Sequence, residues 1–249
     1  MQDFCYSSGM SISVLIIAHN EEKHIAQCIN SVLNQTVHTD EIVLIAHNCT
    51  DQTETIARSF PGVKVVSYQG LDGVPYARIK GFEEVTRDII ACIDGDSVAH
   101  PSWLKHISQP LIDTPHVSLV AGYVILTNNL WSRITSAFQF IWKRKILRQN
   151  TSLFAWGSNF ACRKNDYARV GGIAPVVSLK ETLPLHFWAE DLYISRALMQ
   201  IGRIHIALTA KTYTTLPCWK LDLHTAPLKQ WQEDNRKVVV YFENKNNQQ

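Results

Sequence analysis

Four short apolar runs, separated by segments with helical character, dominate the first part of this chain. Each run is long enough for one strand and is apolar throughout rather than alternating, which is typical of parallel strands buried on both faces. The runs cover residues 11–18, 41–46, 63–66 and 88–93. The segments between them predict helices that run to about Leu33, to about Ser59 and over 74–85. The sequence therefore predicts an α/β fold with helices on both faces of a parallel sheet.

The alternation fades beyond Pro101. There we expect helices over 102–112, 130–148, 165–170, 191–201 and 227–243, and strands over 117–126 and 204–208. The chain has 249 residues, of which 46% are hydrophobic, so it can bury one large core. We predict a single domain over residues 1–249.

The loops after Ala18, Ala46 and Ile93 open at the carboxyl edge of the predicted sheet, where α/β proteins bind ligands. The third loop carries Asp94 and Asp96, separated by one glycine. Two carboxylates this close raise each other's pKa, and a divalent cation would relieve the repulsion. Mg²⁺ and Mn²⁺ typically take one or two carboxylates and complete their shell with water and phosphate oxygens. The alternative is an ordinary Asp-Gly-Asp turn.

Charge is distributed unevenly along the chain. Residues 1–125 hold 7 Lys/Arg and 14 Asp/Glu, which leaves 17 and 8 of the totals of 24 and 22 for the remainder. The first half is therefore acidic and the second basic. This split suits an acidic metal site and does not suggest a nucleic-acid partner, which calls for a basic domain or a known reader motif.

The six cysteines show no C-x-x-C spacing, and Cys28 and Cys92 lie in apolar patterns. Free thiols in a reducing compartment are therefore expected. No apolar run approaches the roughly eighteen residues of a membrane span, and the first residues lack the pattern of a signal peptide. We expect a cytoplasmic protein.

Six motifs resemble, in order, those of the family 2 glycosyltransferases of the GT-A fold, over about residues 11–210. They are SVLIIAHNEE, EIVLIAHNCTDQT, GVPYARIKG, IIACIDGDS, GSNFACRK and WAEDL. The resemblance implies a mostly parallel central sheet, a nucleotide-sugar-binding half over 11–100, and an acceptor-binding half with a C-terminal helix over 101–249. It implies inverting transfer of a sugar from a nucleoside-diphosphate sugar to a hydroxyl acceptor, with Mg²⁺ or Mn²⁺ as cofactor.

In the first loop, the resemblance implies that the backbone of Ile17 and Ala18 and the side chains of His19 and Glu21 hold the base and ribose. A carboxylate suits this role because it accepts hydrogen bonds from ribose hydroxyls. The alternative is that Asn20 and Glu21 cap the following helix.

The second loop departs from the family pattern, because His47 stands where an acid usually accepts a ring N–H of the base. A neutral His47 could accept this hydrogen bond, whereas a protonated one could not. The identity of the base therefore stays open. Thr50 and Asp51 have the spacing of a helix N-terminal cap, and we interpret them as structural.

Arg78 is the better candidate for donor binding on the third helix, because its guanidinium fork matches phosphate oxygens or base edges. Lys80 is interpreted as a surface charge.

The resemblance gives Asp94 and Gly95 a place in the nucleotide-sugar site. It makes Asp96, together with Asp94, the metal-binding pair. His224 is the third ligand by chain order, with an ordinary surface or core histidine as the alternative.

Asp191 would act as the general base that accepts the proton of the attacking hydroxyl, and Glu190 would lie nearer the acceptor or hold a neighbouring residue. The alternative for these two acids is capping, since carboxylates at a helix N-terminus are stabilised by the helix dipole. Gly157, Ser158 and Asn159 would line the sugar and acceptor pocket. Trp156 would stack on a sugar ring or lie in the core.

The aromatic and basic segment 130–148 either rests on an anionic membrane near a lipid-linked acceptor or packs in the core. The Q-x-x-R-W signature of processive members is not matched at Lys229-Gln230-Trp231, so one sugar per visit is expected.

The leading hypothesis is a glycosyltransferase of envelope polysaccharide or glycolipid assembly. A sugar-phosphate nucleotidyltransferase is an alternative, although the loop at residues 19–22 is acidic rather than rich in glycine and lysine. A non-catalytic nucleotide-sugar-binding module is the other, motivated by His47.

Overall fold

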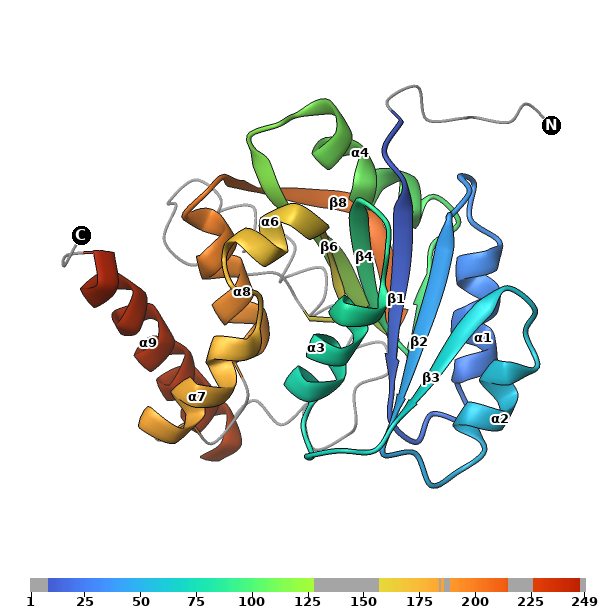
Figure 1. Ribbon diagram of the computed structural model, residues 1–249, viewed down its shortest axis with the longest axis horizontal. Helices are drawn as coiled ribbons and strands as arrows, with labels where there is room; N and C mark the ends of the chain where they lie inside the picture. The colour runs from blue at the N-terminus through green and yellow to red at the C-terminus, as the bar shows by residue number, and fades with distance from the viewer. Residues whose placement is uncertain (1–8, 128–156, 184, 186–188, 215–225, 247–249) are drawn as a thin grey trace.

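The computed structural model describes residues 9–127, 157–183, 185, 189–214 and 226–246. Over these residues the chain forms one sheet of eight strands with helices on both of its faces (Figure 1). The strand order is β3-β2-β1-β4-β7-β6-β8-β5. The strands are β1 Ile12–Ala18, β2 Glu41–His47, β3 Val63–Tyr68, β4 Ile89–Asp94, β5 Ser97–Ala99, β6 Val117–Leu126, β7 Asn159–Arg163 and β8 Arg203–Thr214.

The described helices form two layers around this sheet. They are α1 Ile25–Leu33, α2 Thr53–Arg58, α3 Val74–Glu84, α4 Trp103–Asp113, α6 Lys164–Arg169, α7 Ala174–Thr182, α8 Glu190–Met199 and α9 Ala226–Asn246. Helices α1, α2 and α4 lie on one face, α3, α6, α7 and α8 lie on the other, and α9 packs against α8. The predicted covering of both faces is confirmed.

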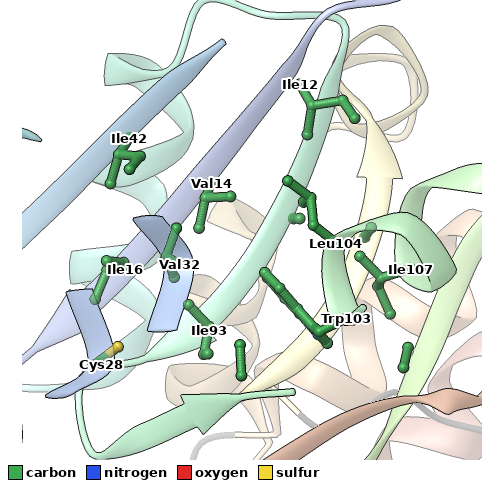
Figure 2. Close-up of a cluster of buried hydrophobic side chains, with 14 of the residues drawn as sticks. Ile12, Val14, Ile16, Cys28, Val32, Ile42, Ile93, Trp103, Leu104 and Ile107 are labelled. Atoms are coloured by element: carbon green, nitrogen blue, oxygen red, sulfur yellow. The ribbon is translucent and has the colours of Figure 1, made fainter. Parts of the chain in front are cut away.

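The four predicted apolar strands are β1 to β4, and they pair in parallel as expected. β1 lies between β2 and β4, and all seven of its residues are buried. Val14 and Ile16 point into the core beneath α1 and α4, whereas Leu15 and Ile17 point into the core beneath α3. Figure 2 shows the first of these cores, where Trp103 of α4 reaches the strands. A strand in this position gains about 1.5–3 kcal/mol for each large aliphatic side chain it buries, on either face.

Helix α3 lies unusually close to β1. A Cβ built on Gly81 would lie 2.6 Å from Cδ1 of Leu15, which is itself fully buried. Glycine therefore lets the helix approach the strand at this position, and the approach brings Arg78, one turn earlier on α3, towards the end of β4.

The second part of the chain matches the predicted strands over 117–126 and 204–208, which lie in β6 and β8. The predicted helices over 102–112, 165–170, 191–201 and 227–243 correspond to α4, α6, α8 and α9. Strands β5 and β7 and helix α7 were not predicted. β7 runs antiparallel between β4 and β6, and its first residue is a buried asparagine, so its polar start gave the pattern of a loop.

The sheet curls strongly. β5 begins only a two-residue turn after β4 ends, yet it pairs with β8 at the far end of the strand order, with Ser97 opposite Thr214. The curl therefore brings the end of β8 next to the end of β4. The overall arrangement is the mostly parallel mixed α/β sheet that was expected, with four parallel and three antiparallel pairs among the described strands.

Three predictions fall outside the described residues: the helix over 130–148, Trp156 and His224. Among the helices that are described, none combines the length and the apolar composition needed to cross a bilayer.

Candidate active site

The ends of β1, β2 and β4 meet at the carboxyl edge of the sheet, as predicted. Ala18 lies opposite Ala46 and Ile17 lies opposite Asp94 in the strand register. The N–H of Gly95 donates to the carbonyl of Ile17 at 2.8 Å, which fixes the loop after β4 against the end of β1. The three loops therefore form one surface.

Hydrogen bonds also join the first and second loops. His19 Nδ1 lies 2.8 Å from the carbonyl oxygen of His47, and the N–H of Thr50 donates to Oδ1 of Asn20 at 2.8 Å. Asn20 adopts a left-handed backbone conformation with φ 55°. The N-cap position of α1 belongs to His24, so Asn20 and Glu21 precede the helix and the capping alternative is not what the structure shows. These hydrogen bonds hold the loop that carries His19 and Glu21 against the second loop.

His47 is buried and stacks on Tyr68, with ring centroids 5.4 Å apart. Its Nε2 lies 3.1 Å from the carbonyl oxygen of Leu71, which can only accept, so Nε2 carries the proton. Burial lowers the pKa of His47, and the nearby His19 lowers it further. The neutral ring therefore leaves Nδ1 as a hydrogen-bond acceptor, which is the form that could replace an acid towards a ring N–H.

Asp51 has the structural role that was predicted. Its Oδ1 accepts from the N–H of Thr53 at 2.9 Å at the start of α2, and its Oδ2 accepts from the N–H of Glu22 at 3.0 Å.

Asp94 is the last residue of β4, and Gly95 and Asp96 form the turn to β5; the carboxylates of Asp94 and Asp96 are both partly buried. Burial, together with the charges of Asp94 and Glu21, raises the pKa of Asp96 to about 6, against the hydroxyls of Thr214 and Ser97, which lower it. Gly95 is required here, because a Cβ would lie 2.9 Å from the Cβ of Ala18. The triplet therefore includes a turn and also places two acids close together, so the turn alternative does not exclude an acidic site.

The acids at this edge can supply part of the shell of a metal ion. Within the described residues, no group of three or more His, Cys, Asp or Glu side chains is arranged to hold an ion. Asp94 and Asp96 are nevertheless crowded with Glu21, and Mg²⁺ or Mn²⁺ needs only one or two protein carboxylates when phosphate oxygens and water complete the shell. Asp94 and Asp96 fit a cation that arrives with a diphosphate.

Arg78 occupies a different environment from the one predicted. Its side chain is only 2% exposed, Nη1 donates to Oε1 of Glu190 at 2.7 Å and Nη2 donates to Oδ1 of Asp94 at 3.2 Å. Gly157 packs against the guanidinium, since a Cβ there would lie 2.3 Å from Nη1. The prediction that the fork of Arg78 binds the donor directly is therefore corrected, because both of its ends are already held by carboxylates. Lys80 is a surface residue as predicted and pairs with Glu84 at 2.6 Å.

Glu190 and Asp191 open α8, and Oε1 of Glu190 accepts from Nη1 of Arg78. Burial raises the pKa of Glu190 to about 7, against the charge of Arg78. Burial also raises the pKa of Asp191, opposed by Arg78 and by the N–H groups of Leu192 and Gly157. Oδ1 of Asp191 accepts from the N–H of Leu192 at 2.7 Å within the first turn, whereas the N-cap position of α8 belongs to Ala189 and has no side-chain cap. A carboxylate whose pKa is raised towards neutrality is a better proton acceptor.

Asn159 does not line a pocket, which corrects the prediction for this residue. It is fully buried, and its Oδ1 accepts from Nε1 of Trp103 at 2.9 Å. Its Nδ2 donates to Tyr123 O, Ala210 O and Thr212 Oγ1. The amide therefore joins α4, β6 and β8. Ser158, the residue before it, is partly exposed.

Sequence reasoning missed Thr214 and the link between Arg78 and Glu190. Thr214 ends β8 and lies next to Asp96 through the curl of the sheet. No motif in the sequence points to either feature, because the partners are far apart in the chain.

Two hollows of about 410 and 690 Å³ lie elsewhere, the first lined by residues such as Val32 and Asp40 and the second by residues such as Leu183 and Tyr241. Neither is lined by the acids described above. The chemistry of the carboxyl edge, not the size of a hollow, places the candidate active site.

The mixed α/β sheet with helices on both faces is the arrangement of the GT-A fold. The crystal structure of glucosyl-3-phosphoglycerate synthase from Mycobacterium tuberculosis in complex with Mn²⁺, UDP and phosphoglyceric acid superposes with a TM-score of 0.61. The match covers 93% of this chain and 76% of that one at 18% identity, so it speaks for the fold alone. Residues 13–171 match the sequence profile described as Glycosyl transferase family 2. Since this is more than half of the chain, the protein belongs to glycosyl transferase family 2, a family of transferase enzymes.

Curated relatives agree with this assignment. An uncharacterized glycosyltransferase of Haemophilus influenzae is 28% identical over 146 residues, which cover 56% of this chain and 45% of the relative. The glucosyl-dolichyl phosphate glucuronosyltransferase of Haloferax volcanii is 27% identical over 121 residues, which cover 47% of this chain and 39% of the relative. The matches span less than half the length of these two relatives.

Proposed function

We propose that this protein transfers one sugar, with inversion, from a nucleoside-diphosphate sugar to a hydroxyl acceptor. One observation carries the proposal: acids from the end of β4 and from the start of α8 meet at a single buried arginine. Asp94 and Glu190 are distant in the sequence, yet both bind Arg78. In this proposal, Asp94 and Asp96 on the donor side and Glu190 and Asp191 on the acceptor side would face one reaction centre.

On the donor side, Asp94 and Asp96 would hold Mg²⁺ or Mn²⁺ together with the diphosphate. When bound, this cation would stabilise the charge that develops on the leaving nucleoside diphosphate. The backbone of Ile17, Ala18 and Gly95 would lie along the nucleotide.

His19 and Glu21 would contact the ribose and base, from a loop that is tied to the second loop. His47 would present Nδ1 to the base, supported by the hydrogen bond from its Nε2 to Leu71. Base recognition would thus use a neutral imidazole in place of an acid.

On the acceptor side, Asp191 would act as the general base. Its carboxylate takes the proton of the acceptor hydroxyl while the oxygen forms a bond to the anomeric carbon. The bond from that carbon to the diphosphate oxygen breaks on the opposite face, which inverts the configuration. Glu190, Gly157 and Ser158 would border the acceptor, and Trp156 and His224 keep their predicted roles as part of this proposal.

The names of similar proteins support the choice of substrates. The Mycobacterium tuberculosis synthase was crystallised with UDP and Mn²⁺, and the Haloferax volcanii relative is named for a dolichyl phosphate-linked substrate. We therefore propose that the acceptor is lipid-linked and belongs to envelope polysaccharide or glycolipid assembly. The segment 130–148 would contact the membrane surface near this acceptor. A cytoplasmic location is supported by free thiols at the described cysteines Cys28, Cys49, Cys92 and Cys162.

A thermal-shift panel of UDP, GDP, CDP and TDP, with and without Mn²⁺ or Mg²⁺, tests donor binding. Stabilisation by one nucleotide only in the presence of the cation is expected, and indifference to all four contradicts the proposal. Asp191→Asn should keep this stabilisation and lower kcat by about 10²–10⁴-fold. Transfer at an unchanged rate would show that Asp191 is not the base.

A further inference from the structure

A single buried guanidinium pairs with two carboxylates that belong to different halves of the proposed site. The guanidinium of Arg78 donates from Nη1 to Glu190 at 2.7 Å and from Nη2 to Asp94 at 3.2 Å. The Asp94 side chain is 36% exposed, whereas that of Glu190 is 10% exposed. Arg78 thus connects a partly exposed acid with one that is largely buried.

The surroundings hold the guanidinium in this position. Gly157 leaves no room on its side, because a Cβ would come within 2.3 Å of Nη1 and 2.5 Å of Nη2. Among the described residues, Nε of Arg78 has no hydrogen-bond partner, so the two carboxylates supply all of its described hydrogen bonds. Burial alone would lower the pKa of Arg78, but Asp94 and Glu190 outweigh it, so the guanidinium stays charged.

The pairing is unequal and can be redistributed. The bond to Glu190 is the shorter one, and the bond to Asp94 lies at the long end of the hydrogen-bond range. A buried cation that loses one partner is drawn more strongly to the other, because an unpaired buried charge is costly.

We propose that Arg78 is a positioning residue that couples cation and diphosphate binding at Asp94 to the placement of Glu190 and Asp191 at the start of α8. The inference rests on the proposed function, since it assigns Asp94 to the cation. A cation at Asp94 competes with Arg78 for the same carboxylate and repels the guanidinium. The guanidinium is then held by Glu190, which fixes the first turn of α8 and with it Asp191.

The coupling must be reciprocal, because a change that one site makes in the affinity of the other acts equally in both directions. Weakening the hold of Glu190 on Arg78 therefore strengthens the hold of Asp94 on Arg78. A cation would then bind less tightly at Asp94, although Glu190 is not among its ligands.

The test measures binding of Mn²⁺ alone by electron paramagnetic resonance, and then of Mn²⁺ with each of the four nucleoside diphosphates, at about pH 8 so that both acids are ionised. Glu190→Gln keeps the shape of the side chain but removes its charge, and should weaken Mn²⁺ binding by about fivefold or more. Asp191→Asn removes the same charge one residue further along and should change Mn²⁺ binding less than about twofold. Equal weakening by both variants would reduce the effect to general electrostatics and overturn the proposal, as would an unchanged affinity in Glu190→Gln.

A second variant examines the arginine itself. Arg78→Lys retains the charge, but one ammonium group cannot span both carboxylates in the manner of the fork. We expect kcat to fall by about tenfold or more, and we expect Glu190→Gln to change the Mn²⁺ affinity less when it is combined with Arg78→Lys than when it is made alone. Lys80→Gln on the same helix is the matched control and should leave both quantities unchanged. A full effect of Glu190→Gln retained beside Arg78→Lys contradicts the coupling, and if Arg78→Lys does not fold, the comparison of Glu190→Gln with Asp191→Asn decides.

The outcomes separate the two proposals. Absence of any Mn²⁺ or nucleotide binding by the wild-type protein would overturn the proposed function. Normal wild-type binding with no difference between Glu190→Gln and Asp191→Asn would overturn only the role of Arg78.

Discussion

The two parts of the sheet are built in different ways. Strands β1 to β4 follow one another along the chain with one helix between each pair, and all of the pairings among them are parallel. The loops after β1 and β2 are joined by hydrogen bonds between backbone groups and short side chains. In β5 to β8, antiparallel and parallel pairs mix, and buried polar groups such as Asn159 hold the elements together. The first part can therefore form a ligand site almost locally, whereas the second depends on long-range contacts, and Arg78 joins the two.

The largest expected effect is a loss of activity without a loss of folding, caused by a substitution in the acidic site of the first part. Asp96→Ala should lower transfer by about 10³-fold and abolish cation-dependent stabilisation by nucleotide, because it removes half of the acid pair. The folded protein should be retained, since burial and neighbouring acids raise the pKa of Asp96 and already penalise its charge. Steady-state assays and thermal shift check this result, with the exposed Asp113→Ala as the control. Activity within tenfold of wild type would rule out the metal role.

Asn159→Ala probes the second part. It removes the acceptor of Nε1 of Trp103 and one donor to each of the carbonyls of Tyr123 and Ala210, so we expect a loss of about 3 kcal/mol in the free energy of unfolding. Urea denaturation measures it, with Asn34→Ala at the exposed end of α1 as the control. A raised KM at unchanged stability would instead support the original prediction that Asn159 contacts sugar.

Gly81→Ala tests how tightly α3 packs on the first part. Alanine gains about 1 kcal/mol of helix propensity, but the contact with Leu15 costs about 1–3 kcal/mol in a buried core. We expect a net loss of about 1 kcal/mol by chemical denaturation, with Lys80→Ala as a control on the same helix. A more stable Gly81→Ala protein would mean that α3 moves freely.

The smallest expected effect is on the pH dependence of stability, and it concerns Glu190, which pairs with Arg78 between the two parts. Burial raises the pKa of Glu190 from 4.5 to about 7, so over this range the folded protein keeps a proton that the unfolded chain releases. The contribution of Glu190 to stability therefore falls as the pH rises from about 4.5 to about 7, the reverse of an ordinary salt-bridged acid. Glu190→Gln should flatten this part of a stability profile measured by denaturation, whereas Glu233→Gln, at an exposed position of α9, should not. An unchanged slope in Glu190→Gln would place the titration elsewhere.

The sequence predicted the first part of the sheet better than the second. β1 to β4 and the meeting of their loops were predicted, because a fully apolar strand followed by a polar cap is a local pattern. β7 was missed, because a strand that begins with a buried asparagine has the pattern of a loop. The predicted role of Arg78 was also wrong. The sequence shows that a guanidinium could bind phosphate, but it does not show that Glu190 and Asp94 already bind this guanidinium.

The sequence by itself determined the family, the parallel core and the positions of the acids Asp94, Asp96, Glu190 and Asp191 at element ends. Only the tertiary structure decided how those acids are connected. Arg78 and Glu190 are 112 residues apart, and their pairing depends on the close approach allowed by Gly81 and Gly157. Apolar patterns are local and can be recognised in the sequence. The pairing of buried charges depends on which distant groups the packed core brings together.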